Sequence, residues 1–215
     1  GGTRILTQFL TADAIDYLRM ATAPFFVGDS HAPRFVHAGR FPHNKNRRMH
    51  LLSTQAVGDM SVAIYALKAS AEDYARMEQA ITLAAQCPPS KGAYSVGAVI
   101  VTEDGQVFTG YSRETAPTNH AEEEAILKAI RAGSRLTGAT VYSSMEPCTT
   151  RKSKPASCSE LIILHRMKRV VFAAYEPPTF VTCLGEAVLR QAGIEVTILS
   201  DLAQKALDVN RHLAK

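Results

Sequence analysis

The sequence predicts an α/β domain over residues 70–215, preceded by a smaller α+β segment over residues 1–68. Two observations predict this organisation. From residue 70 onward, helical and strand patterns alternate in the order αββαβαβαβα, which is typical of a sheet of about five strands with helices on both faces. Residues 1–68 lack this alternation, so we expect the domain boundary at Ala69-Ser70. Parallel strands in such a sheet need right-handed crossovers.

The helices expected in the larger domain have apolar residues at helical spacing and recognisable ends. The first has one apolar face and ends at Cys87-Pro88-Pro89. Asn119 is the expected N-cap of the second helix, and Ser157 with Glu160 forms a capping box for the third. The expected helices cover residues 71–86, 120–132, 159–165, 184–192 and 202–213.

The strands expected in this domain are short apolar runs between those helices. The first two flank the turn Glu103-Asp104-Gly105 and predict a hairpin. The expected strands cover residues 95–101, 106–111, 140–145, 170–174 and 194–199.

The N-terminal segment has a weaker pattern. We expect a helix over residues 11–18, an apolar strand over residues 20–27 and a hairpin of residues 50–57 and 60–67 around Gly58-Asp59. These elements offer little material to close a core, so this segment needs a neighbour to stabilise it.

Composition and charge exclude several classes of protein. A hydrophobic content of 46% and a charged content of 20% describe an ordinary soluble protein. No run approaches the ~18 apolar residues of a membrane helix and no signal segment opens the chain, so we expect a cytoplasmic protein without a membrane partner. Residues 1–68 hold eight of the 24 Lys and Arg and four of the 20 Asp and Glu residues, which leaves sixteen of each for residues 69–215. That neutral balance argues against a nucleic-acid partner.

One group of residues in the sequence indicates a metal-dependent catalytic site. His120-Ala121-Glu122 is followed by Cys148, which has Pro147 before it, and then by Cys158. One imidazole and two thiolates are a ligand set that zinc prefers, and three protein ligands leave a fourth position open for water. Glu122 is the proton carrier that hydrolysis of an amino group from a heterocycle requires. The signature of zinc nucleobase deaminases is H-x-E…P-C-x-x-C, and this chain departs from it because residues 149–157 separate the two cysteines.

The expected elements place these residues together. His120 and Cys158 fall in the first turns of two helices, and Cys148 falls just beyond a strand end. The carboxyl edge of an open α/β sheet is where catalytic sites form, and helix N-termini favour thiolates. We expect Cys87 and Cys183 to be free core thiols, and Glu123 and Glu124 to be exposed helix residues.

Over nearly all of residues 70–215, the chain resembles the riboflavin-pathway pyrimidine deaminases of the cytidine-deaminase-like superfamily. The long loop from Glu146-Pro147-Cys148 to Pro155-Ala156-Ser157-Cys158 is similar to the zinc loop of that family. The stretches Asn119–Glu122, Ser144–Cys148 and Glu176–Val181 resemble the fungal-type branch, in which reduction of the sugar precedes deamination. The resemblance implies a three-layer α/β/α fold with a mixed sheet of about five strands. It also implies a homo-oligomer, with a dimer as the expected form.

The implied activity is hydrolytic deamination of 2,5-diamino-6-ribitylamino-4(3H)-pyrimidinone 5′-phosphate, with Zn²⁺ as cofactor. Two other functions stay open: deamination of another nucleobase, nucleoside or nucleotide, and a non-catalytic interaction protein stabilised by zinc. The intact Glu122 argues against the second, because a structural site needs four protein ligands and no proton carrier. A nucleic-acid editor is the weakest candidate, given the neutral charge balance and the long zinc loop.

A substrate phosphate needs cations or helix N-termini. Arg151, Lys152 and Lys154 lie inside the zinc loop and are the nearest candidates, with Arg113 next. The amide of Asn119 is a further candidate for substrate contact. Tyr94 and Ser95 stand where the bacterial-type branch has a Pro-Asn-Pro stretch, and they complete the expected binding residues.

The opening of the chain has its own resemblance. Gly1-Gly2-Thr3 followed by Ala23–Gly28 is similar to the last third of the pathway's pyrimidine reductase, a dihydrofolate-reductase-like domain. In that family the paired glycines lie against the cofactor phosphates. Residues 1–68 are therefore expected to be a partial reductase-like segment that does not reduce the ribosyl substrate.

Overall fold

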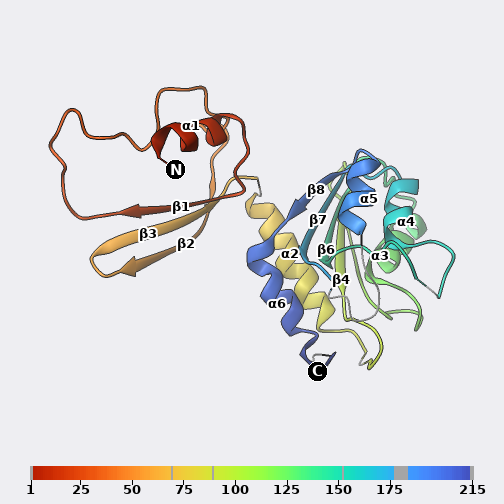
Figure 1. The fold of residues 1–215 in the computed structure, drawn as a ribbon. Helices are drawn as coiled ribbons and strands as arrows, with labels where there is room; N and C mark the ends of the chain where they lie inside the picture. Colours follow the sequence, from red (N-terminus) through yellow and green to blue (C-terminus); the bar gives the residue numbers. More distant parts are fainter. Residues whose placement is uncertain (1, 69, 89, 152, 177–183, 214–215) are drawn as a thin grey trace. The chain divides into compact units, whose positions relative to one another are not determined.

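The computed structural model describes residues 2–68, 70–88, 90–151, 153–176 and 184–213. The chain divides into two compact units, Gly1–Ala71 and Glu72–Lys215 (Figure 1). Within the described ranges, no helix is both long enough and apolar enough to span a bilayer.

The larger unit is built on a mixed five-stranded sheet in the order β5-β4-β6-β7-β8. Its strands are β4 (Gly97–Val101), β5 (Val107–Tyr111), β6 (Thr140–Met145), β7 (Arg169–Ala174) and β8 (Glu195–Ile198). The strand β4 is antiparallel to both β5 and β6, whereas β6, β7 and β8 run parallel. The predicted hairpin and the predicted mixed sheet are both confirmed.

Helices cover both faces of this sheet, as the alternating pattern predicts. They are α2 (Ala71–Ala84), α3 (Ala121–Arg131), α4 (Cys158–Leu164), α5 (Gly185–Gln191) and α6 (Ala203–Asp208). Figure 1 shows α2 and α6 side by side on one face, and α3, α4 and α5 on the other. The helix predicted over residues 202–213 is shorter than expected. Short 3-10 turns at Ser200–Leu202 and Arg211–Leu213 flank α6, and the chain turns at Asn210, whose side chain is buried.

The core of this unit lies between the sheet and the helices α3, α4 and α5. Val141, Val170 and Phe172 from the parallel strands are fully buried against Ile162 of α4 and Leu189 of α5. Such side chains contribute about 1.5–3 kcal/mol each when removed from water. This packing fixes the first turns of α3 and α4 relative to the ends of β5 and β6, which is where the chemistry-bearing residues lie.

On the other face, a buried ion pair joins α2 to the sheet. The Asp73 carboxylate accepts hydrogen bonds from Arg169 Nη1 at 2.6 Å, from Arg169 Nη2 at 3.2 Å and from Tyr142 Oη at 3.0 Å. Asp73 is 2% exposed, so its charge depends on these partners for stabilisation. Burial and the neighbouring Asp73 raise the pKa of Tyr142, which therefore stays a hydrogen-bond donor.

The smaller unit is a helix and a three-stranded antiparallel sheet in the order β1-β3-β2. Its elements are α1 (Thr3–Thr11), β1 (Tyr17–Thr22), β2 (His50–Val57) and β3 (Met60–Ala66). The hairpin around Gly58-Asp59 is confirmed, but the helix predicted over residues 11–18 is wrong. The observed helix α1 ends at Thr11, just before Asp13 takes a positive φ of 53°. The strand β1 then begins at Tyr17, earlier than predicted. Its core holds the buried side chains of Leu10, Leu18 and Leu67.

Candidate active site

Three candidate metal ligands meet at one end of the sheet in the larger unit. His120 directly precedes α3, Cys148 follows the end of β6, and Cys158 is the first residue of α4. The capping box at α4 forms as predicted: Ser157 Oγ accepts from the Glu160 amide, and Glu160 accepts from the Ser157 amide at 2.7 Å. This cap fixes the helix start and with it the Cys158 thiol.

The spacing of these ligand atoms suits a tetrahedral zinc ion. His120 Nδ1 lies 3.5 Å from Cys148 Sγ and 3.4 Å from Cys158 Sγ, and the three ligand atoms all lie within 4.8 Å of one another. Zinc–sulfur and zinc–nitrogen bonds of about 2.3 Å and 2.05 Å at a tetrahedral angle put ligand atoms about 3.6 Å apart. The donor set and its spacing therefore fit zinc.

The two thiols form a coupled pair. The hydrogen bond from Cys158, followed by the neighbouring His120, lowers the pKa of Cys148 to about 4. The same hydrogen bond, together with burial, raises the pKa of Cys158. Cys158 Sγ also lies 3.2 Å from Glu122 Oε2. A metal binds both sulfurs as thiolates, so metal binding requires the loss of any thiol proton.

Glu122 lies in the first turn of α3, directly beside the three ligands. It is 3% exposed, and burial is the main cause that raises the pKa of its carboxyl group. Ser143, on β6, donates from Oγ to Glu122 Oε1 at 2.9 Å. One carboxylate oxygen is therefore held by the sheet, and the other faces the ligand trio. Sequence reasoning missed Ser143, although two successive serines in a buried strand are a signal for such contacts.

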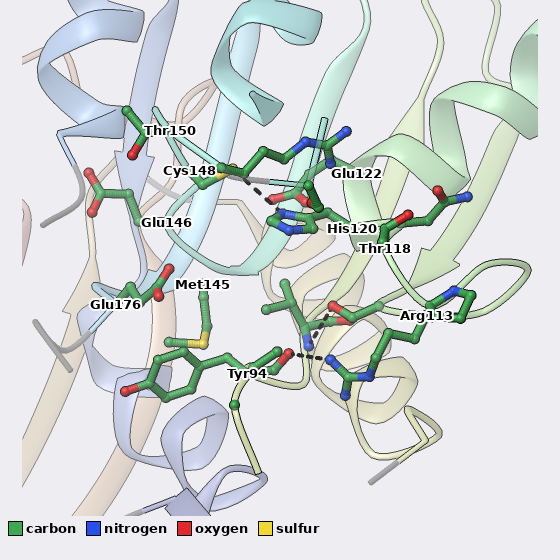
Figure 2. A pocket seen from close by; sticks show the side chains of 18 residues that line it. Tyr94, Arg113, Thr118, His120, Glu122, Met145, Glu146, Cys148, Thr150 and Glu176 are labelled. Atoms are coloured by element: carbon green, nitrogen blue, oxygen red, sulfur yellow. Dashed lines mark hydrogen bonds between the residues drawn. The ribbon is translucent and has the colours of Figure 1, made fainter. Parts of the chain in front are cut away.

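A cavity of 340 Å³ opens beside these residues, which is within the usual size range of small-molecule sites. Figure 2 shows His120, Glu122 and Cys148 on one side of it and Tyr94 with Arg113 on the opposite side. Of the expected binding residues, Tyr94, Arg113, Asn119 and Arg151 line the cavity. Ser95 and Lys154 do not line it, and Lys152 falls outside the described residues.

Two cations of the zinc loop, Arg151 and Lys154, are paired with a carboxylate. Arg151 Nη2 donates to Glu123 Oε2 at 3.0 Å, and Lys154 Nζ donates to Glu123 Oε1 at 2.6 Å. Burial raises the pKa of Glu123, but the hydrogen bonds from Lys154 and Arg151 outweigh it and lower the pKa overall. The prediction that Glu123 is exposed is therefore wrong: the residue is 9% exposed because it serves as the counter-ion of the loop.

The predictions for Asn119 as an N-cap and for Glu124 as an exposed residue are also wrong. His120 occupies the N-cap position of α3, and no side chain caps that helix. The Asn119 amide instead donates from Nδ2 to Glu124 Oε1 at 3.0 Å and accepts from Lys154 Nζ at Oδ1. Glu124 is 1% exposed and also accepts from the amide and hydroxyl of Thr115, both at 2.8 Å. The loop before α3 thus folds back onto the helix and buries the carboxylate.

Cys87 does not belong to the ligand trio. Cys87 is half-buried and donates from Sγ to Val96 O at 3.4 Å, so it is a free thiol at the edge of the core. Burial raises the pKa of this thiol. Cys183 falls outside the described residues.

Comparison with known proteins identifies a family for most of the larger unit. Residues 70–174 match the model of the cytidine and deoxycytidylate deaminase zinc-binding region. Residues 70–174 belong to this family. The deaminase domain therefore has zinc as its cofactor, with one histidine and two cysteines placed to hold it.

Individual relatives of the deaminase domain come from fungi and bacteria. A diaminohydroxyphosphoribosylamino-pyrimidine deaminase from Schizosaccharomyces pombe is 45% identical over 127 residues, which cover 58% of this chain and 31% of that protein. The chain thus spans about a third of the length of this relative. The crystal structure of Aspergillus oryzae Rib2 deaminase in complex with DARIPP is similar with a TM-score of 0.56 and 26% identity, covering 64% of this chain and 88% of that one. A deaminase/reductase from Thermotoga maritima is similar with a TM-score of 0.55 and 29% identity, covering 66% and 40%.

Proposed function

We propose that the deaminase domain hydrolyses the 2-amino group of 2,5-diamino-6-ribitylamino-4(3H)-pyrimidinone 5′-phosphate. Water is consumed, and 5-amino-6-ribitylaminouracil 5′-phosphate and ammonia are released. The observation that carries this proposal is the buried Glu122 carboxylate beside a three-ligand zinc site at a small-molecule cavity. The names of the fungal and bacterial relatives support the pyrimidine substrate.

His120, Cys148 and Cys158 hold the zinc ion in this proposal, and zinc at such a site activates water as a nucleophile at neutral pH. Glu122 moves the protons. Its Oε1 is engaged by Ser143, so Oε2 is the oxygen that accepts the proton of the attacking water. When both cysteines are metal-bound thiolates, Cys158 no longer donates to Oε2, which leaves that oxygen free to act.

The same carboxyl group then passes this proton to a ring nitrogen of the pyrimidine. It next takes the proton of the newly added hydroxyl group and passes it to the departing amino group, which leaves as ammonia. Burial raises the pKa of Glu122, so the protonated carboxyl group is accessible closer to neutral pH than that of a solvated glutamate. A carboxyl group that both takes and gives protons near the working pH contributes about 10²–10⁴-fold to the rate.

Arg151 is the residue that we propose for the substrate phosphate. Its side chain is 4% exposed, and it lines the cavity. Arg151 Nε and Nη1 are buried with no hydrogen-bond partner among the described residues, whereas Lys154 Nζ already contacts Asn119 and Glu123. These unsatisfied guanidinium donors make Arg151 the better candidate of the two for charge-assisted hydrogen bonds to a phosphate. Lys154 then acts by fixing Asn119 and Glu123, and Lys152 stays a candidate.

The activity is tested by mass spectrometry of the product formed from the ribityl substrate by the zinc-loaded full chain. The ribosyl analogue, cytidine 5′-phosphate and deoxycytidine 5′-phosphate serve as competing substrates. The expected result is a product of the ribityl substrate whose mass corresponds to the replacement of one amino group by oxygen. Turnover of another pyrimidine alone would move the chain to a different deaminase reaction, and no turnover by zinc-loaded protein would support a non-catalytic role.

The phosphate proposal is tested on Arg151→Ala, Lys152→Ala and Lys154→Ala with the substrate and its dephosphorylated form. A charge-assisted contact is worth about 1.5–3 kcal/mol, so KM for the phosphorylated substrate should rise roughly 10–100-fold in Arg151→Ala. KM for the dephosphorylated substrate should change little. Equal losses on both substrates would contradict a phosphate role.

For the smaller unit, we propose a partial reductase-like segment; its described residues form one helix and a three-stranded sheet around a small core. A homodimer in the cytoplasm remains our expectation for the assembly and its location.

A further inference from the structure

We propose that Arg113 and Asn210 are positioning residues that fix one wall of the substrate cavity, formed by residues 90–96. This inference rests on the proposed function only for the identity of the substrate. Gly92, Ala93, Tyr94 and Val96 of this wall line the cavity. Residues 90–96 are in neither a helix nor a strand, so their backbone groups must find hydrogen-bond partners elsewhere.

Arg113 supplies the first set of partners. It follows β5 with a positive φ of 65°, and its guanidinium group spans the wall. Nη2 donates to Pro88 O at 2.8 Å, and Nε donates to the same carbonyl at 3.2 Å. Nη1 donates to Tyr94 O at 3.0 Å (Figure 2). Nη2 also reaches Ser95 Oγ at 3.2 Å. All three guanidinium nitrogens therefore hold the chain itself, which argues against the phosphate role expected for Arg113.

Asn210 supplies the second set from the C-terminal side of α6. Its Oδ1 accepts from the Ser95 amide at 2.7 Å, and its Nδ2 donates to Ser95 O at 3.0 Å. The side chain thus pairs with both backbone groups of Ser95 as a neighbouring strand would. Asn210 is 4% exposed, which makes these contacts hard for water to replace. Close by, His212 Nε2 lies 3.1 Å from Ser90 O.

The two residues converge on Ser95 from different parts of the chain. Arg113 contacts its hydroxyl, and Asn210 contacts its backbone. None of the contacts described for Arg113 or Asn210 involves the ligand trio or Glu122. Loosening this wall should therefore weaken substrate binding more than it changes the chemical step, which appears as a raised KM with a nearly unchanged kcat.

The test uses Arg113→Lys and Asn210→Asp in the full chain. Lysine keeps the charge but cannot span Pro88, Tyr94 and Ser95 at once. Aspartate keeps the acceptor for the Ser95 amide but loses the donor to Ser95 O. We expect KM to rise by about tenfold or more in each variant, equivalent to about 1.4 kcal/mol, with kcat within about threefold and zinc content unchanged. Arg131→Lys, at an exposed arginine at the end of α3, is the matched control.

Hydrogen exchange supplies a readout that needs no substrate. Peptides covering residues 90–96 should exchange faster in both variants, and peptides from β6 and α4 should not. Because both side chains hold Ser95, the rise in KM of the double variant should be smaller than the product of the rises in the two single variants.

Unchanged KM and unchanged exchange of the wall would overturn the inference, as would a loss of kcat and zinc at constant KM. If the unmodified chain turns over no pyrimidine, the proposed function fails, and the exchange data alone decide whether these residues hold the wall. If one variant does not fold, the other gives the same readouts.

Discussion

Gly110 in β5 is a position where one added methyl group should disturb the zinc site. A Cβ built there would lie 2.4 Å from Ala121 O, 2.7 Å from Ala125 N and 2.8 Å from Glu124 Cβ. The first two are backbone atoms of α3, so no side chain can rotate away. Ala121 stands between His120 and Glu122, which ties the clash to the two functional residues of that helix.

The size of the displacement follows from these contacts. Real Cβ contacts essentially never fall below 3.0 Å, and ordinary ones begin at 3.4 Å. Relative to 2.4 Å, α3 must therefore retreat by 0.6 to 1.0 Å (3.0 − 2.4 and 3.4 − 2.4). Metal–ligand distances tolerate about 0.2 Å. Gly110→Ala should thus move His120 out of range of a zinc ion that both cysteines still hold.

We expect Gly110→Ala to lower the free energy of unfolding by about 1–3 kcal/mol, as overpacking does. We also expect zinc affinity to fall roughly tenfold or more, because loss of a group that only hydrogen-bonds to a metal ligand already lowers metal affinity by about that factor. Zinc affinity is measured by competition with a chromogenic chelator, and stability is measured by urea unfolding. Gly92→Ala is the control for both measurements, because its Cβ would meet no heavy atom within 4 Å. Zinc affinity and a urea midpoint equal to those of the unmodified chain would refute the reasoning.

Four further predictions concern the proton carrier, the metal and the buried ion pair. Glu122→Gln should keep zinc and the fold but lose turnover by at least ~10², because glutamine cannot carry protons; retained kcat would assign the role to another group. X-ray absorption of the zinc-loaded chain should count two sulfur ligands, and four would mean a structural site. Removal of zinc by a chelator should lower the melting temperature of the chain, and its return should restore it. Asp73→Asn should destabilise the larger unit by about 3 kcal/mol, because it removes the charge of the buried partner of Arg169; an unchanged urea midpoint would show that Glu195 suffices.

Local sequence signals were sufficient to predict the structure of segments that depend mainly on their own residues. Hydrophobic periodicity predicted the order of strands and helices in the larger unit, and the Ser157–Glu160 pair predicted the start of α4. The candidate metal ligands could also be named from the sequence, because a histidine and two cysteines next to Glu122 are informative as residue types. Their placement at one end of the sheet followed from the element order alone.

Contacts between distant segments decided the rest. Glu124 looks like a solvated helix residue, but Thr115 and Asn119 fold over it and bury its carboxylate. Arg113 looks like a phosphate ligand, but its three guanidinium nitrogens donate to Pro88 O and to Tyr94 and Ser95 of the cavity wall. The partner of that wall, Asn210, has no local signal, because its role depends on a residue 115 positions away. Hydrogen-bond partners, unlike periodicity, are set by which surfaces the packed core brings together, and only the tertiary structure decides that.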